Sequence, residues 1–170
     1  MLFLAEPSLV YKESFIAGTR ESQAEGLELF YNLDKISKDF EGLLQILRDA
    51  SNRAKIPPER VPMSDFWLID GDEYVGRLSL RHELNEALLL WGGHIGYQIR
   101  PSKRRRGYGK EILRLGLLKA KELGLNRVLV TCDEDNIGSR KIIEYNGGQL
   151  ENIIEVKDSP VRKMRYWIDI

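Results

Sequence analysis

The amino-acid sequence predicts a single α/β domain, and three features of the chain support this prediction. A strand, a basic turn and a helix follow one another in residues 92–123. Residues 127–132 (RVLVTC) form a further buried strand, and this strand–helix–strand order implies a right-handed parallel crossover. Asp70-Gly71 stands between two apolar segments, which is typical of an antiparallel hairpin. A chain of 170 residues is long enough for one domain with a substantial core.

The N-terminal part of the chain is predicted to be mostly helical after a short strand at residues 2–4 (LFL). Residues 6–8 (EPS) suit the start of a helix, and Gly18 is expected to end it. A second helix is predicted from Ser37 onward, because apolar residues then recur at helical spacing. Three prolines exclude a helix from residues 56–62, which are predicted to form an extended loop.

The central strand is predicted from the alternation of Ile95, Tyr97 and Ile99, which puts these three side chains on one face of a sheet. Pro101 ends that strand, because proline has no N–H group to donate to a neighbouring strand. From Gly109 onward the apolar residues recur at helical spacing, with charged residues between them.

The remaining elements follow from the same signals. The central helix is expected to stop at Gly124, and residues 81–91 are expected to be a loop or a short helical turn. Acidic and asparagine residues open a helix within residues 133–148, which Gly147 closes. Four further strands are predicted, at residues 66–69, 74–80, 149–156 and 161–168.

The charge of the chain argues against two kinds of partner. Lysine plus arginine and aspartate plus glutamate each number 26, so no overall field favours nucleic acid or a membrane surface. The basic run also lacks an aromatic platform on which bases could stack, so a nucleic-acid-binding domain is disfavoured. The longest apolar run, residues 87–91, is too short to span a bilayer, and no signal peptide opens the chain.

Residue types that report on redox and metal chemistry are sparse. Cys132 is the only cysteine, so no internal disulfide is expected, which is compatible with the cytoplasmic location that we predict. His82 and His94 lie apart from any cysteine or carboxylate pattern with metal-ligand spacing, and no metal site is predicted.

The turn that follows the central strand has the features of an anion site. It carries four cations, residues 103–106 (KRRR), followed by Gly107-Tyr108-Gly109. The first N–H groups of a helix have no partner and carry the positive end of its dipole, and glycines let a ligand approach them. The turn therefore predicts a phosphate or pyrophosphate site, with a solvated basic loop as the alternative. No GxxxxGK[ST] is present, and Ile112 replaces the third glycine of GxGxxG.

Two motifs in order point to one family. Residues 104–109 (RRRGYG) match the pattern [QR]xxGx[GA] at a strand–helix junction. Asn136 is followed by Ser139 three residues later and by Gly147 eleven residues later. With these motifs the chain resembles the GNAT superfamily of N-acetyltransferases, which transfer an acetyl group from acetyl-coenzyme A (acetyl-CoA) to an amine. The resemblance covers residues 64–168 by motif and the first 60 residues only by position.

The resemblance implies a fold and a cofactor site. The fold would be a single GNAT domain over residues 1–170, with a mixed, mostly antiparallel sheet and helices on both faces. Residues 1–62 would form the variable acceptor side, and residues 63–170 the acetyl-CoA-binding core. The implied cofactor-binding residues are Gln98, Ile99, Arg104, Arg105, Arg106, Gly107, Tyr108, Gly109, Lys110, Asn136 and Ser139. Asn136 could instead be only the N-cap of its helix.

The chain departs from the family at its usual acid and base. The tyrosine that many members use to protonate the departing thiolate is replaced by Ile143, and the frequent glutamate base by Thr131. Tyr145 lies about 200° further around an ideal helix and is not expected to substitute. Either other groups catalyse the reaction, or the thiolate leaves unaided, which its thiol pKa of about 8.5 allows.

His94 is the predicted base, because an imidazole of pKa about 6.5 can accept a proton at neutral pH. Alternation places it on the face opposite Ile95, together with Gln98. A histidine that only packs at the sheet surface is the alternative, and Glu83 or Glu86 could serve through a chain of water molecules.

The predicted activity is acetyl transfer from acetyl-CoA to a primary amine by direct attack in a ternary complex. The acceptor could be a small molecule or a peptide, and a homodimer is left open. The alternatives are a regulatory protein that binds coenzyme A or acyl-CoA without efficient turnover, and a purely structural domain, which would not need the paired motifs.

Overall fold

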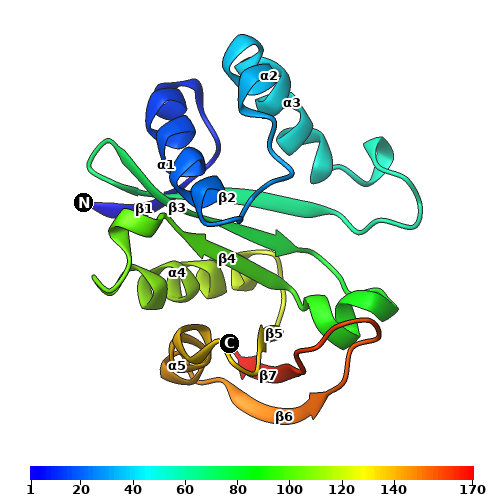
Figure 1. The fold of residues 1–170 in the computed structure, drawn as a ribbon. Helices are drawn as coiled ribbons and strands as arrows, with labels where there is room; N and C mark the ends of the chain where they lie inside the picture. The colour runs from blue at the N-terminus through cyan, green and yellow to red at the C-terminus, as the bar shows by residue number, and fades with distance from the viewer.

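Seven strands form one sheet in the order β1-β2-β3-β4-β5-β7-β6 in the computed structural model, which describes all 170 residues (Figure 1). Neighbouring strands are antiparallel except for β4 and β5, which are parallel. The predicted mixed, mostly antiparallel sheet is therefore confirmed. The strands are β1 (Leu2–Ala5), β2 (Met63–Asp70), β3 (Glu73–Arg81), β4 (Ile95–Ile99), β5 (Arg127–Asp133), β6 (Gln149–Ile154) and β7 (Lys163–Asp169).

Helices cover both faces of the sheet, with α1, α2 and α3 on one face and α4 and α5 on the other (Figure 1). Each face has its own hydrophobic core, and the smaller core, under α1–α3, is built around the stacked rings of Phe15 and Trp67. None of the helices combines the length and hydropathy that crossing a bilayer requires. The α-helices are α1 (Lys12–Ala24), α2 (Leu33–Lys38), α3 (Phe40–Ala50), α4 (Tyr108–Glu122) and α5 (Ile137–Tyr145).

The N-terminal helices differ from their predicted bounds. The first helix begins at Lys12 and continues past Gly18, where the sequence predicts its end. Gly18 is a packing residue, because a Cβ atom there would lie 2.8 Å from the ring of Tyr74. The short helix α2 is not predicted, although Asn32 caps it by accepting a hydrogen bond from the N–H of Lys35.

Most of the other predicted elements are confirmed. The hairpin β2–β3 turns at Gly71, whose φ of +66° suits the predicted turn, and residues 56–62 contain no helix or strand. Helix α3 begins three residues after the predicted start at Ser37, because Asp39 caps it through the N–H of Gly42. A five-residue π-helical turn, Leu88–Gly92, lies in the segment predicted as a loop or helical turn.

Strands β4 and β5 run side by side only briefly. Their one register pair is Ile95 with Val130, and a second contact joins His94 to Leu129. The His94 N–H donates to the Leu129 carbonyl at 2.7 Å, and the Leu129 N–H donates to His94 Nδ1 at 2.9 Å. Beyond this point no register pair joins the strands, so β4 has an unpaired edge toward β5.

The unpaired edge of β4 carries two backbone N–H groups. In an antiparallel pair, alternate residues bond to the same neighbour, and Arg100 donates to β3. Gly96 and Gln98 therefore also bond to β3, while the N–H groups of Tyr97 and Ile99 point toward β5. The alternation of side chains is as predicted, since Ile95 and Ile99 are buried in the core under α4–α5 and Tyr97 packs against it.

Replacement of Gly93 by alanine is expected to destabilise the protein by about 3 kcal/mol or more. Gly93 has a φ of +67°, and a Cβ atom there would lie 2.6 Å from the backbone oxygen of Leu129. Gly147→Ala is the matched control, because its φ is +87° and no atom lies within 4 Å of the added Cβ. That variant should lose only about 1 kcal/mol in urea unfolding. Equal losses would show that the close approach of the two backbones is unimportant.

Candidate active site

A cavity of about 570 Å³ lies where the strands part. It is bounded by the end of β4, the turn before α4 and the first turn of α5. The residues that line it are Leu27, Tyr97, Gln98, Ile99, Arg104, Arg105, Gly107, Gly109, Lys110, Asn136, Gly138, Ser139 and Ile142. No acidic side chain and no histidine is among them, so the lining carries only positive formal charge.

The turn that borders this cavity contains a row of free backbone N–H groups. Those of Arg105, Arg106 and Gly107 donate to no backbone carbonyl, and those of Tyr108 and Gly109 open α4. Two left-handed residues, Arg105 at φ +61° and Gly107 at φ +86°, bend the chain around this row. Successive N–H groups in such a turn, at the positive end of a helix dipole, form a site for an anion.

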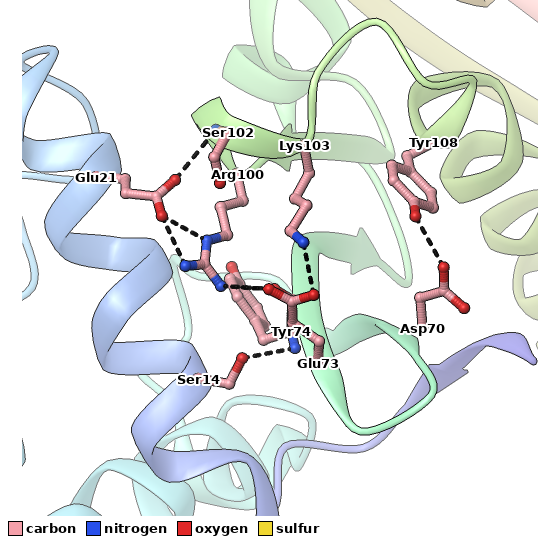
Figure 2. Close-up of polar contacts among 9 residues, drawn as sticks. All are labelled: Ser14, Glu21, Asp70, Glu73, Tyr74, Arg100, Ser102, Lys103 and Tyr108. Carbon is pink, nitrogen blue, oxygen red and sulfur yellow. Dashed lines mark hydrogen bonds and ion pairs between the residues drawn. The ribbon is translucent and has the colours of Figure 1, made fainter.

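The start of the turn is fastened to α1 (Figure 2). The Arg100 guanidinium lies 2.6 Å from Glu21, and the Ser102 N–H donates to the same carboxylate at 3.1 Å. These contacts, with the hydrogen bond from Arg100 first, lower the pKa of Glu21 to about 2. The carboxylate therefore stays ionised at neutral pH and holds the turn in place.

Two residues of the basic run 103–106 also hold the turn in place. Lys103 pairs with Glu73 of β3 at 2.6 Å, and Arg104 pairs with Glu25 at the end of α1, also at 2.6 Å. Two of the four cations predicted to surround a ligand are thus committed to carboxylates of the protein. They position the turn before any ligand arrives.

The other members of the run differ from one another. Arg105 and Arg106 are exposed and form no ion pair within the chain, but only Arg105 lines the cavity. The Tyr108 hydroxyl donates to Asp70 at 2.8 Å, so its side chain fastens α4 to the hairpin (Figure 2).

Nine of the eleven predicted cofactor residues meet in the cavity. Arg106 and Tyr108 do not line it. Sequence reasoning missed Tyr97 and Ile142, because their apolar spacing indicates core packing. It also missed Gly138 of α5 and Leu27, which lies far from β4 in the chain. Only the folded chain brings these residues to the same cavity.

The family is established by comparison with known proteins. The chain matches the model of the acetyltransferase (GNAT) domain over residues 47–149, which is more than half of its length. This chain belongs to the GNAT family. It is an N-acetyltransferase. No curated protein sequence matches it.

Solved GNAT structures share the fold at low sequence identity. RimJ of Mycobacterium smegmatis, in complex with CoA-disulfide, is 21% identical with a TM-score of 0.70, covering 99% of this chain and 81% of that one. RimL, a ribosomal-protein α-N-acetyltransferase in complex with coenzyme A, is 15% identical with a TM-score of 0.71, covering 99% and 94%. The microcin self-immunity acetyltransferase MccE, in complex with acetyl-CoA and AMP, is 14% identical with a TM-score of 0.70, covering 99% and 92%.

Asn136 caps its helix and also has a free donor in this GNAT enzyme. Its Oδ1 accepts a hydrogen bond from the N–H of Ser139 at 3.0 Å, which is the capping role considered as the alternative. Its Nδ2 donates to no protein group, and the residue lines the cavity. The two roles therefore use different atoms of one amide.

Asn136→Ala is expected to lower both stability and acetyl-CoA affinity. The lost cap costs about 1 kcal/mol, and the lost ligand bond should raise the dissociation constant roughly fivefold to tenfold. Asn136→Asp keeps the cap through its carboxylate and has no N–H to donate, and its added negative charge should weaken acetyl-CoA binding further. Calorimetry measures the acetyl-CoA affinity of both variants, and thermal unfolding measures their stability. Unchanged affinity in Asn136→Asp would leave Asn136 with capping alone.

Two hydroxyl groups meet in the cavity near the position of the missing family tyrosine. The Tyr97 hydroxyl and Ser139 Oγ are 2.9 Å apart, and burial raises the pKa of Tyr97 to about 12. Ile143 is fully buried. The Tyr145 ring is exposed under Lys110 Nζ, 3.9 Å from its centroid, and does not line the cavity. Tyr145 is therefore not placed to replace the tyrosine, as expected.

His94, the predicted base, lies outside the cavity and has a structural hydrogen bond. It is 7% exposed, and its Nδ1 accepts the N–H of Leu129. Burial, and next the Arg81 guanidinium, lower the pKa of His94 to about 4. With Nδ1 engaged, the neutral ring carries its proton on Nε2 and has no free lone pair to accept another. Glu83 and Glu86 do not line the cavity either.

No group of three or more histidine, cysteine, aspartate or glutamate side chains is placed to hold a metal ion. The single cysteine, Cys132, is buried, and burial raises the pKa of its thiol to about 11. A thiol of that pKa is almost entirely protonated at neutral pH, and the neutral form is a poor nucleophile.

Proposed function

We propose that this GNAT enzyme moves the acetyl group of acetyl-CoA to a primary amine by direct attack in a ternary complex. One observation carries the proposal: a single cavity joins the free N–H groups of the turn to the unpaired edge of β4. Transfer through an acetylated cysteine is disfavoured, because Cys132 is buried with a raised pKa. Holding both substrates in one site supplies much of the rate.

The turn fits the pyrophosphate of coenzyme A. Its free N–H groups run from Arg105 to Gly109, whereas the Lys110 N–H already donates to the Gly107 carbonyl at 3.0 Å. The Arg105 and Lys110 side chains add positive charge, and no carboxylate lines the cavity to repel an anion. These groups would bind the diphosphate mainly through the backbone.

The unpaired edge of β4 fits the thioester end of acetyl-CoA. Bound acetyl-CoA supplies a thioester, whose carbonyl carbon is open to attack by an amine. The N–H groups of Tyr97 and Ile99 point toward β5 at the parted edge. Donors fixed in this way stabilise negative charge on a carbonyl oxygen without having to reorganise.

The hydroxyl pair fits the departing sulfur. The Tyr97 hydroxyl, with a pKa of about 12, does not readily give its proton to a thiolate whose own acid has a pKa of about 8.5. Together with Ser139, it would instead stabilise the sulfur by donating a hydrogen bond. The enzyme then needs no dedicated acid at the position of Ile143.

The acceptor must reach the site as a neutral amine, because no side chain of the cavity lining is a base. Arg104, Arg105 and Lys110 favour the neutral form, since nearby cations lower the pKa of an ammonium group. Small-molecule and peptide amines both satisfy this requirement. RimL acts on a ribosomal protein, so peptide N-termini belong in the first panel of acceptors tested.

The test is a panel of amines assayed for release of free coenzyme A. At least one amine should be acetylated, with initial-rate lines that intersect when both substrates are varied. Parallel lines, or an acetylated protein found by mass spectrometry in the absence of acceptor, would overturn direct attack. Acetyl-CoA binding without turnover of any amine would favour the regulatory alternative.

A further inference from the structure

A second cavity, of about 510 Å³, lies on the other face of the sheet. It opens to solvent and lies between α2–α3, the segment 30–32 before α2, and strands β2–β3. It shares no lining residue with the cavity described above. Its wall is mostly apolar and is formed by Phe30, Ile36, Leu43, Ile46, Leu47 and Met63.

A buried carboxylate lines this apolar cavity with one oxygen unused. Asp65 is 6% exposed, and its Oδ1 accepts a hydrogen bond from Ser79 Oγ at 2.6 Å. Its Oδ2 is buried and has no hydrogen-bond partner in the protein. A buried carboxylate oxygen without a donor costs free energy, so the site is suited to a ligand that brings one.

Two guanidinium groups lie near Asp65, but neither donates to its Oδ2. Arg77 lies 2.8 Å from Glu28 and 3.4 Å from Asp65, so this guanidinium serves two carboxylates. Arg81 lies close enough to Asp65 for their charges to interact, but its Nη1 donates to the carbonyls of Gly92 and Gly93. A charged donor on a ligand would give Asp65 Oδ2 the strong hydrogen bond that it lacks.

The Arg77 guanidinium lies between the two carboxylates, against aromatic rings. It lies over the rings of Phe30 and Tyr31, at 5.0 and 5.6 Å from their centroids. The Tyr31 segment is held in turn by Gln23, whose amide donates to the Tyr31 carbonyl at 2.7 Å. In this position Arg77 contacts Glu28 and Asp65 Oδ1, and Asp65 Oδ2 has no donor.

We infer that this cavity binds the acceptor through a second, positively charged group, an ammonium or guanidinium that donates to Asp65 Oδ2. The inference rests on the proposed function. The two cavities are neighbours, because Arg77 pairs across the strands with Gln98, which lines the acetyl-CoA cavity. Asp65 is two strands away from β4, or about 10 Å. The acceptor class is thus an amine that carries a cation roughly this far away on an apolar chain.

Binding to the free protein tests the inference without any turnover. Heptylamine should bind in calorimetry, and Asp65→Asn should weaken that binding roughly tenfold or more, as expected for a charged hydrogen bond. Heptan-1-ol, which has the same chain and an uncharged donor, should lose much less affinity in Asp65→Asn than heptylamine does. Absence of heptylamine binding, or equal affinity in Asp65→Asn, would overturn the inference and leave Asp65 Oδ2 merely hydrated.

A second variant covers the case in which Asp65→Asn does not fold. Ile46 lines the cavity but is 65% exposed, so Ile46→Trp should fill the cavity without disturbing the core. It should abolish heptylamine binding and leave acetyl-CoA affinity unchanged. Leu118→Trp, at a 49% exposed position of α4, is the control and should change neither. Heptylamine binding that survives Ile46→Trp would place the amine elsewhere.

Turnover then separates this inference from the proposed function. With 1,7-diaminoheptane as acceptor, kcat/KM should exceed that for heptylamine by roughly tenfold, and Asp65→Asn should remove the difference. Equal values for both acceptors in the parent would refute the second charged group while leaving acetyl transfer intact. If no amine is acetylated, the proposed function is refuted. The binding results alone would then show whether this cavity binds a cation.

Discussion

Gly107→Val is expected to weaken acetyl-CoA binding by roughly a hundredfold. Gly107 has a φ of +86° in the middle of the row of free N–H groups, and a β-branched residue is strongly disfavoured there. The turn would have to change its backbone conformation, and the N–H groups would no longer converge on the pyrophosphate. Isothermal titration with acetyl-CoA measures the effect directly.

Two comparisons give this result its meaning. Gly124→Val adds the same side chain at a φ of +85°, in equally open space, at the other end of α4. It should lower stability and leave acetyl-CoA affinity alone. Arg105→Ala should weaken binding much less than Gly107→Val, because that exposed cation is partly redundant with Lys110. Parent-like affinity in Gly107→Val would refute the assignment of the turn.

The rate of acetyl transfer is expected to rise about tenfold per pH unit below the pKa of the acceptor, or about a hundredfold from pH 6 to pH 8 for an alkylamine. Only the neutral amine attacks, and no residue lining the cavity accepts its proton. The inflection should move with the acceptor, from about pH 10 for an alkylamine to about pH 8 for a peptide α-amine.

His94→Ala provides the control for this pH dependence. His94 has a pKa of about 4 and so remains neutral over the whole range. The variant should keep the parent's pH profile and lose about 1–3 kcal/mol of stability, because the Leu129 N–H is left without an acceptor. An inflection near pH 6.5 that is the same for both acceptors and vanishes in His94→Ala would restore His94 as the base.

The turn and the start of α5, which we propose hold the cofactor, could be predicted because their signals are local. Pro101 ends a strand, Gly107 supplies a left-handed residue, and Asn136 caps a helix wherever such segments occur. The motif residues therefore describe most of the turn geometry by themselves. They do not show that Tyr108 turns toward Asp70, because that contact depends on the hairpin.

The contacts under α1–α3 could not be predicted, because they join distant parts of the chain. Gly18 has the composition of a helix stop, and only the fold shows that it packs against Tyr74. Asp65 lies just outside the strand predicted at residues 66–69, and nothing in the sequence links it to Arg77. Alternation along β4 predicts on which face of the sheet His94 lies. Its hydrogen bond to Leu129 could not be predicted, because it depends on where β4 and β5 separate.

The fastening of the turn to α1 would link the two substrates thermodynamically if the acceptor shifts α1 when it binds. Glu21 and Glu25, in α1 and at its end, hold Arg100 and Arg104 of the turn. An acceptor that shifts α1 on binding also shifts these carboxylates, and so alters the affinity for acetyl-CoA. Linkage is reciprocal, so acetyl-CoA must then change the affinity for the acceptor by the same factor. Cooperativity and a preferred order of substrate addition would thus arise from ion pairs that touch neither substrate's reacting atoms.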